Sequence, residues 1–157
     1  MKSDSEKPFW EILFFCTLGL LIATWLLPLL YWSSLPELIP VHFNGRGEAD
    51  GMGSRFSLFL VPATASVLFC LLAYFGRRPV LWEKYQLALS GIDAGRLFEA
   101  LSFLCAAMFF FLQYMVTDAA RNARMPGYFW IFWVFISLFI FIVPVSQALL
   151  VTRRRQQ

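Results

Sequence analysis

The residues of this chain that are most able to support chemistry lie in one hydrophilic stretch, residues 33–55, which reads SSLPELIPVHFNGRGEADGMGSR. The stretch contains the only histidine of the chain, His42, followed closely by Asn44 and Asp50. A histidine and an aspartate can bind a divalent metal such as zinc, and a histidine can also change its charge near neutral pH. These three side chains can instead converge on a peptide or another extracytoplasmic ligand.

The same stretch has a purely structural interpretation. Prolines at 36 and 40 favour extended backbone before them, so residues 41–43 are expected to form a short extended segment. Asn44-Gly45 and Asp50-Gly51 are dipeptides typical of turns. In this interpretation Asn44 and Asp50 cap turns through their side chains, His42 hydrogen-bonds across the loop, and the glycines supply positive φ. We expect a compact, ordered loop with two tight turns.

Other catalytic and binding chemistry has little support in the sequence. The three cysteines, Cys16, Cys70 and Cys105, lie singly inside apolar runs, which is typical of small buried hydrophobic residues rather than of a disulfide framework or a metal site. There is one histidine, with no serine–histidine or paired-carboxylate motif, so we expect no enzymatic activity and no cofactor. The net charge of +3 is small and dispersed, which disfavours nucleic-acid binding.

The elements around this stretch are apolar and long. Hydrophobic types make up 59% of the chain and charged types 15%, against about 45–50% and about 25% in soluble domains. Spanning a bilayer takes about 20 mostly apolar residues in a helix. Four segments meet that length, at residues 9–32, 56–75, 97–117 and 128–152. The sequence therefore predicts an all-α protein, a single membrane domain over residues 1–157 built as a four-transmembrane-helix bundle.

The distribution of Lys and Arg predicts the orientation of these spans. Basic residues are concentrated in residues 1–7, 77–96 and 153–155, and are sparser in the other two connections. The positive-inside rule then places both termini and residues 77–96 in the cytoplasm, and residues 33–55 outside, in a multi-pass protein of the bacterial cytoplasmic membrane. Apolar residues recur at helical spacing in residues 77–96, which predicts a short amphipathic helix on the inner interface.

Polar residues within the predicted spans are few. Glu11 and Glu99 lie near the inner ends of their spans, where we expect them at the interface. The alternative for Glu99 is that it faces the bundle interior and pairs with another span. Gln113 and Gln147 are expected to form hydrogen bonds between helices. Because no span carries a series of ionisable residues across the bilayer centre, the sequence disfavours an ion or proton transporter.

One run of residues resembles a known family. It is carried by Leu35-Pro36, Ile39-Pro40, His42-Phe43-Asn44, Gly47, Asp50-Gly51 and Gly53-Ser54. These residues resemble the signature L-P-x-x-I-P-x-H-F-N-x-x-G-x-x-D-G-x-G-S of a bacterial membrane family of unknown function. That domain is also found at the N-terminus of SdpI-type toxin-immunity and signalling proteins. The resemblance implies that His42, Asn44, Gly47, Asp50 and Gly51 form a ligand-binding or structural signature, with His42 and Asp50 as candidate metal ligands.

These observations favour a membrane protein that senses or binds an extracytoplasmic factor and signals or protects through protein partners. In that role its partners are the lipid bilayer and another protein. The alternative is an accessory subunit in which residues 33–55 form only a folded cap, and a metal-dependent membrane enzyme is less favoured.

Overall fold

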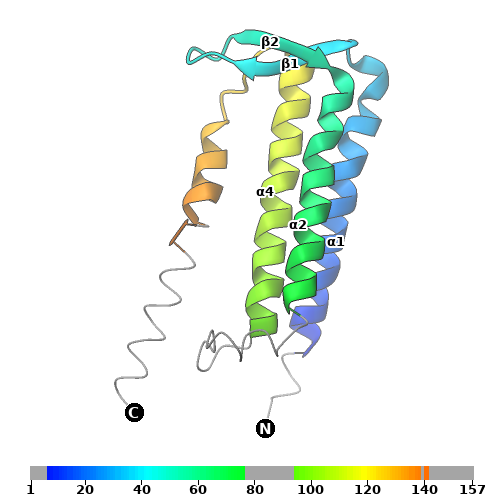
Figure 1. Ribbon diagram of the computed structural model, residues 1–157, viewed down its shortest axis with the longest axis vertical. Helices are drawn as coiled ribbons and strands as arrows, with labels where there is room; N and C mark the ends of the chain where they lie inside the picture. Colours follow the sequence, from blue (N-terminus) through cyan, green and yellow to red (C-terminus); the bar gives the residue numbers. More distant parts are fainter. Residues whose placement is uncertain (1–6, 77–93, 139, 142–157) are drawn as a thin grey trace.

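A computed structural model describes residues 7–76, 94–138 and 140–141 of the chain (Figure 1). Three long helices lie side by side, and a two-stranded antiparallel sheet crosses one end of them. In chain order the elements are α1 (Lys7–Leu30), a 3-10 turn (Trp32–Ser34), β1 (Leu38–Phe43), β2 (Ala49–Ser54), a second 3-10 turn (Arg55–Phe59), α2 (Leu60–Gly76) and α4 (Ala94–Asn122).

The three helices, with their flanking turns, confirm that this is a multi-pass membrane protein. Segments Pro8–Ser34, Arg55–Gly76 and Gly95–Asn122 are each long and apolar enough to cross a bilayer. In lipid a spanning segment must satisfy its own backbone groups, which a helix does internally. The predicted spans 9–32 and 56–75 agree with these bounds. The third extends beyond the predicted 97–117 at both ends, because α4 continues into less apolar residues such as Arg96, Asp118 and Arg121.

The predicted fourth span, residues 128–152, is described only in part. Residues 130–138 and 140–141 are helical, and Phe135 packs against Phe111 of α4 with ring centroids 5.8 Å apart. The remainder lies outside the described residues, so a four-helix bundle is not confirmed. Most of the predicted amphipathic helix at 77–96 also lies outside them. Its last three residues belong to α4.

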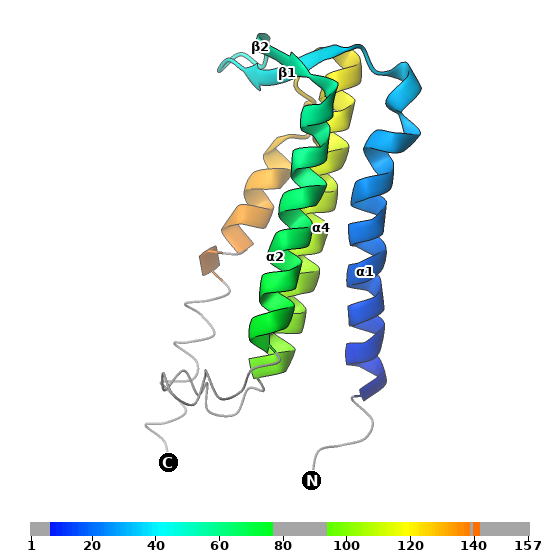
Figure 2. The ribbon, with the colours of Figure 1, turned by 45° about the vertical axis from the view of Figure 1, so that its right-hand side comes forward.

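The helix order in space differs from the order in sequence. α4 packs along both α1 and α2, whereas α1 and α2 touch each other at few points (Figure 2). One core cluster holds the three together and consists of Leu21, Ala65 and Ala106. Small residues on α2 and α4 allow their backbones to approach closely, as is common between membrane helices.

Buried hydroxyl groups within the bundle are satisfied by their own helix. Thr17 and Thr24 donate to the carbonyls four residues earlier, at 2.8 Å and 2.7 Å, and Ser102 does the same at 2.7 Å. Gln113 was expected to bond between helices, but its Nε2 donates to Thr117 one turn later in α4, at 3.2 Å. Among the described residues this bond stays within one helix, because the side chain finds an acceptor at i+4, and Gln147, the other glutamine expected to bond between helices, lies outside them. Its buried Oε1 has no partner among the described residues.

Candidate functional site

Residues 38–54 form a β-hairpin whose turn is organised by Asn44. The Asn44 carbonyl accepts from the Gly47 amide at 2.9 Å, and its own amide donates to the Glu48 carbonyl at 2.9 Å. Its Oδ1 accepts from the amides of Arg46 and Glu48 at 2.9 Å and 3.1 Å. Gly47 has φ of 78°, a left-handed conformation that glycine adopts without steric cost. The predicted Asn44-Gly45 turn is therefore present, and Asn44 acts structurally.

The second predicted turn, at Asp50-Gly51, is wrong because these residues lie inside β2. Gly51 pairs with His42 across the hairpin, and a Cβ on Gly51 would lie 2.9 Å from the His42 Cβ. The close approach of the neighbouring strand requires glycine here. Cross-strand pairing thus overrides the local turn preference of the dipeptide. The pairing shifts register on both sides of His42, as in a β-bulge.

His42 and Asp50 are brought together on the outward face of the hairpin. The His42 Nδ1 contacts the Asp50 Oδ1 directly. Their side chains are 72% and 44% exposed, so the pair contributes little to any hydrophobic core. Asn44 does not join them, because its amide nitrogen donates to the Glu48 carboxylate at 2.9 Å. Of the three side chains predicted to converge, two do.

The opposite face of the hairpin is fixed to the bundle by an apolar cluster. Ile39 is fully buried and packs with Leu35, Leu58 and Ala120. The rings of Tyr31 and Trp32 cover this cluster from the end of α1. Burying a side chain of this size is worth about 1.5–3 kcal/mol, so Ile39 is a principal anchor of the hairpin.

Arginines hold the segments that flank the hairpin, and backbone bonds attach the hairpin itself. The Arg55 guanidinium lies 4.4 Å from the ring centroid of Trp32, and Arg121 lies 4.4 Å from that of Tyr31, both within cation–π range. The Met125 amide donates to the Gly47 carbonyl at 3.3 Å, and Glu48 forms an isolated β-bridge with Arg124. Backbone bonds therefore join the hairpin to the chain following α4, while the two arginines join the segments that flank it to one another and to α4.

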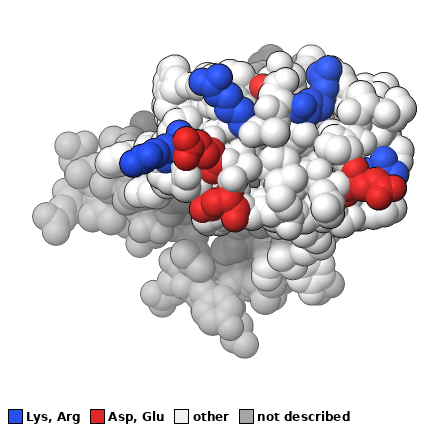
Figure 3. All heavy atoms as spheres, turned by 90° about the horizontal axis from the view of Figure 1, so that it is seen from above, with Lys and Arg blue, Asp and Glu red and all other residues white. Residues whose placement is uncertain are grey.

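Acidic and basic side chains are interspersed on this end of the molecule (Figure 3). Beneath the hairpin, a cavity of about 310 Å³ opens between β1, α2 and α4. Its lining is apolar apart from one serine: Ile39, Pro40, Val41, Phe43, Ser57, Leu60, Val61, Met115, Val116, Ala119 and Met125. The hairpin thus presents polar groups on one face and an apolar hollow under the other.

The arrangement offers a metal only two side-chain ligands, His42 and Asp50. Within the described part of the chain, no group of three or more His, Cys, Asp or Glu side chains could hold a metal ion. A structural zinc site normally has four protein ligands and a catalytic one three. The exposed pair is better suited to hydrogen bonding with a polar ligand than to holding a metal by itself.

Several residues of the site were not identified from the sequence. Ile39 is the main anchor, and the alternation of Ile39, Val41 and Phe43 is the strand signal that could have revealed it. Glu48 was not singled out in the sequence, yet its carboxylate accepts from Asn44 in the turn and its backbone forms a β-bridge with Arg124. No local pattern indicates that bridge, because it joins segments far apart in sequence.

Comparison with known proteins shows what the chain is similar to. Residues 19–65 match the family described as "Domain of unknown function (DUF1648)", which covers the second half of α1, the hairpin and the start of α2. An "Uncharacterized protein" from Archaeoglobus fulgidus is 30% identical over 146 residues of the match. The match covers 78% of this chain and 80% of that protein. No solved structure matches the chain.

Proposed function

This chain belongs to a membrane protein family of unknown function that carries the DUF1648 domain, and we propose that it binds an extracytoplasmic factor at the hairpin. In this proposal it is not an enzyme, and it acts through a protein partner in the membrane. The resemblance of residues 35–54 to the SdpI-type signature supports a role in sensing or protection.

The observation that carries the proposal is the exposed His42–Asp50 pair on an otherwise anchored hairpin. The imidazole and carboxylate of the pair can donate and accept hydrogen bonds, and both side chains are exposed to a ligand. Ile39 holds the strand that carries His42 in place. A ligand that binds such a preformed site does not have to order a loop, so less affinity is lost to conformational entropy. The bond of His42 to Asp50 across the hairpin fits the structural interpretation as well, and the exposure of the pair is what favours binding.

The proposal includes an orientation. The hairpin and the connection after α4 share one end of the bundle, and α1 and α4 both begin at the other (Figure 1). The concentration of Lys and Arg in residues 1–7 and 77–96 supports a cytoplasmic location for that other end. The hairpin then faces outward from the cytoplasmic membrane. The relative from Archaeoglobus fulgidus is archaeal, so in this proposal the family is not restricted to bacteria.

The alternative is a folded cap on an accessory subunit, and the turn chemistry of Asn44 and Gly47 favours it. The two functions differ in what the pair does. As a cap, the hairpin needs Asn44 and Ile39 but not the exposed pair. As a binding site, it needs His42 and Asp50 as well.

Site-specific photo-crosslinking in intact cells tests the proposal. A photoreactive residue replaces Met52, which is 58% exposed on β2, and adducts are compared among His42→Ala, Asp50→Ala and the matched surface control Glu37→Ala. We expect both pair variants to lose the adduct at unchanged protein level, and the control to retain it. An adduct that persists in both pair variants would refute the binding role and favour the cap.

A further inference from the structure

The outer edge of β2 is open along most of its length. β2 packs against β1 and has few contacts with any helix, and four of its six residues are exposed. The Arg55 amide donates across the hairpin to the Glu37 carbonyl at 3.0 Å. Because backbone groups alternate in direction along an antiparallel pair, the N–H and C=O groups of Met52 and Ser54 point away from β1. From this open edge we propose that β2 binds an extended peptide segment of the extracytoplasmic factor by strand addition, and this inference rests on the function proposed for the hairpin.

The chain itself pairs with this edge at the beginning of β2. The Glu48 carbonyl accepts from the Asn44 amide inside the hairpin at 2.9 Å. The Gly47 carbonyl, one residue earlier, faces the other side and accepts from the Met125 amide at 3.3 Å. Glu48 and Arg124 form an antiparallel β-bridge there. The outer edge can therefore hold an added antiparallel strand without a change in the hairpin.

Helix α4 prevents the chain from covering the rest of the edge. In the register of the bridge, the next partner of Asp50 would be Asn122, which is the last residue of α4. A helical residue cannot continue a strand, so the pairing ends at Glu48. The other edge of the hairpin is blunted, because Pro40 of β1 has no N–H, whereas β2 contains no proline or basic residue. An incoming strand is therefore received on β2 and not on β1.

The chemistry of the edge matches a polypeptide backbone. Donors and acceptors alternate along residues 52–54, which pair in unbroken register with residues 38–40 across the hairpin. An extended peptide presents the complementary groups at the same spacing of about 3.4 Å per residue. The Met52 side chain is 58% exposed, and Asp50, which contacts His42, lies two residues before it in β2. We expect an apolar residue of the peptide opposite Met52 and a hydrogen-bond donor beside Asp50.

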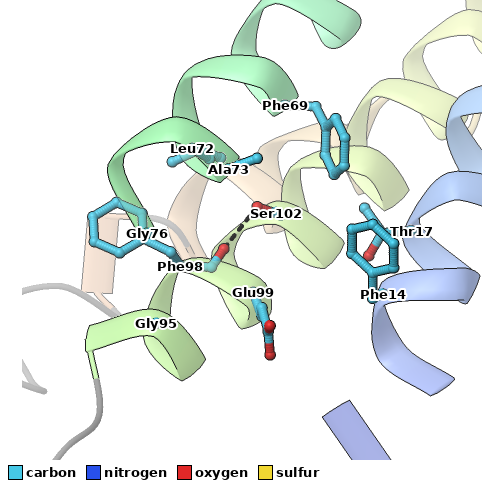
Figure 4. Close-up of a pocket in the computed structure, with 10 residues that line it drawn as sticks. All are labelled: Phe14, Thr17, Phe69, Leu72, Ala73, Gly76, Gly95, Phe98, Glu99 and Ser102. Carbon is cyan, nitrogen blue, oxygen red and sulfur yellow. Dashed lines mark hydrogen bonds between the residues drawn. The ribbon is translucent and has the colours of Figure 1, made fainter. Parts of the chain in front are cut away.

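Two cavities of the bundle lie apart from this edge. The larger one is under β1 and is lined by no residue of β2. The smaller one, of about 70 Å³, is lined by residues of α1, α2 and α4 at the end of the bundle opposite the hairpin (Figure 4). Small molecules usually bind in concave pockets, so the open edge is suited to a peptide and not to a small molecule.

Photo-crosslinking in intact cells, with the photoreactive residue at position 52, tests the strand addition. Ser54 has φ of −65°, the angle that proline requires, so Ser54→Pro removes the outward N–H without a change of backbone conformation. We expect the adduct to fall about tenfold in this variant at unchanged protein level, because the added strand loses a hydrogen bond and meets the proline ring. The matched variant Ser54→Ala loses the same hydroxyl but keeps the N–H, and it is expected to lose less than about half of the adduct.

Hydrogen–deuterium exchange of the purified adduct, compared with the uncrosslinked chain, reports the pairing itself. The amides of residues 52 and 54 are expected to gain about tenfold protection, while that of Arg55, already bonded to Glu37, stays unchanged. Equal adduct losses in Ser54→Pro and Ser54→Ala, or no gain in protection, would overturn strand addition. The function proposed for the hairpin stands in that case if His42→Ala still removes the adduct. An adduct between two copies of this chain would also overturn the peptide ligand. If the unaltered hairpin forms no adduct at all, the proposed function itself fails, and strand addition fails with it.

Discussion

Replacement of Ile39 by alanine probes the attachment of the hairpin to the bundle. The side chain is fully buried in a cluster with Leu35, Leu58 and Ala120. Truncation of a buried isoleucine to alanine costs about 2–5 kcal/mol, from lost transfer free energy and from the cavity left behind. We take about 3 kcal/mol for this site. Since about 1.4 kcal/mol corresponds to a factor of ten, the undocked hairpin becomes about a hundredfold more populated.

Hydrogen–deuterium exchange of the chain in nanodiscs measures this change directly. Amides of residues 38–54 that exchange by undocking are expected to lose about a hundredfold in protection, while those of α1 and α4 keep theirs. The matched control is Leu38→Ala, one residue earlier in β1 and 59% exposed, which should cost less than about 0.5 kcal/mol. Equal exchange in the two variants would show that Ile39 does not hold the hairpin in place.

Three further substitutions test the hairpin and the end of α4, each measured as the free energy of unfolding in SDS titrations. Gly53→Ala should destabilise the protein by about 1–3 kcal/mol, because the new Cβ would lie 2.8 Å from a methyl of Val41. A Cβ at Gly45 meets nothing within 4 Å, so the control Gly45→Ala should be nearly neutral. Equal effects of the two substitutions would contradict the close approach at Gly53. Asn44→Ala should cost about 1–2 kcal/mol, because two backbone amides lose their side-chain acceptor; no loss would mean that the turn forms without it. Ala123→Gly should stabilise by about 1 kcal/mol, because Ala123 has φ of 50° after the end of α4; a destabilised variant would argue against strain there.

The sequence was sufficient to predict the membrane class and three of the spans. Long apolar segments have few options in a bilayer, so hydropathy alone identifies them. The ordered loop and the turn at Asn44 could also be predicted, since both follow from local backbone preferences. The resemblance identified the stretch that carries the hairpin.

The remaining features depend on contacts between distant residues. Asp50-Gly51 has the composition of a turn, and only its pairing with His42 places it in a strand. Gln113 was expected to bond between helices. The rotation of α4 about its own axis decides which groups this side chain can reach, and composition does not specify that rotation. A small cavity between the last turns of α2 and the first turns of α4, which Phe14 and Thr17 of α1 also line, arises from three helices at once. No local pattern in any one of them predicts it.

The central position of α4 has a consequence for biosynthesis. α1 and α2 leave the ribosome first, yet each finds most of its packing surface on a helix that is synthesised later. Both must therefore reside in lipid for a time as separate helices. Thr17 and Thr24 do not prevent this, because each hydroxyl is satisfied within α1 before any partner arrives. α4 carries the buried Gln113 Oε1 that has no partner among the described residues, and it enters the membrane when two helices are already present to shield it.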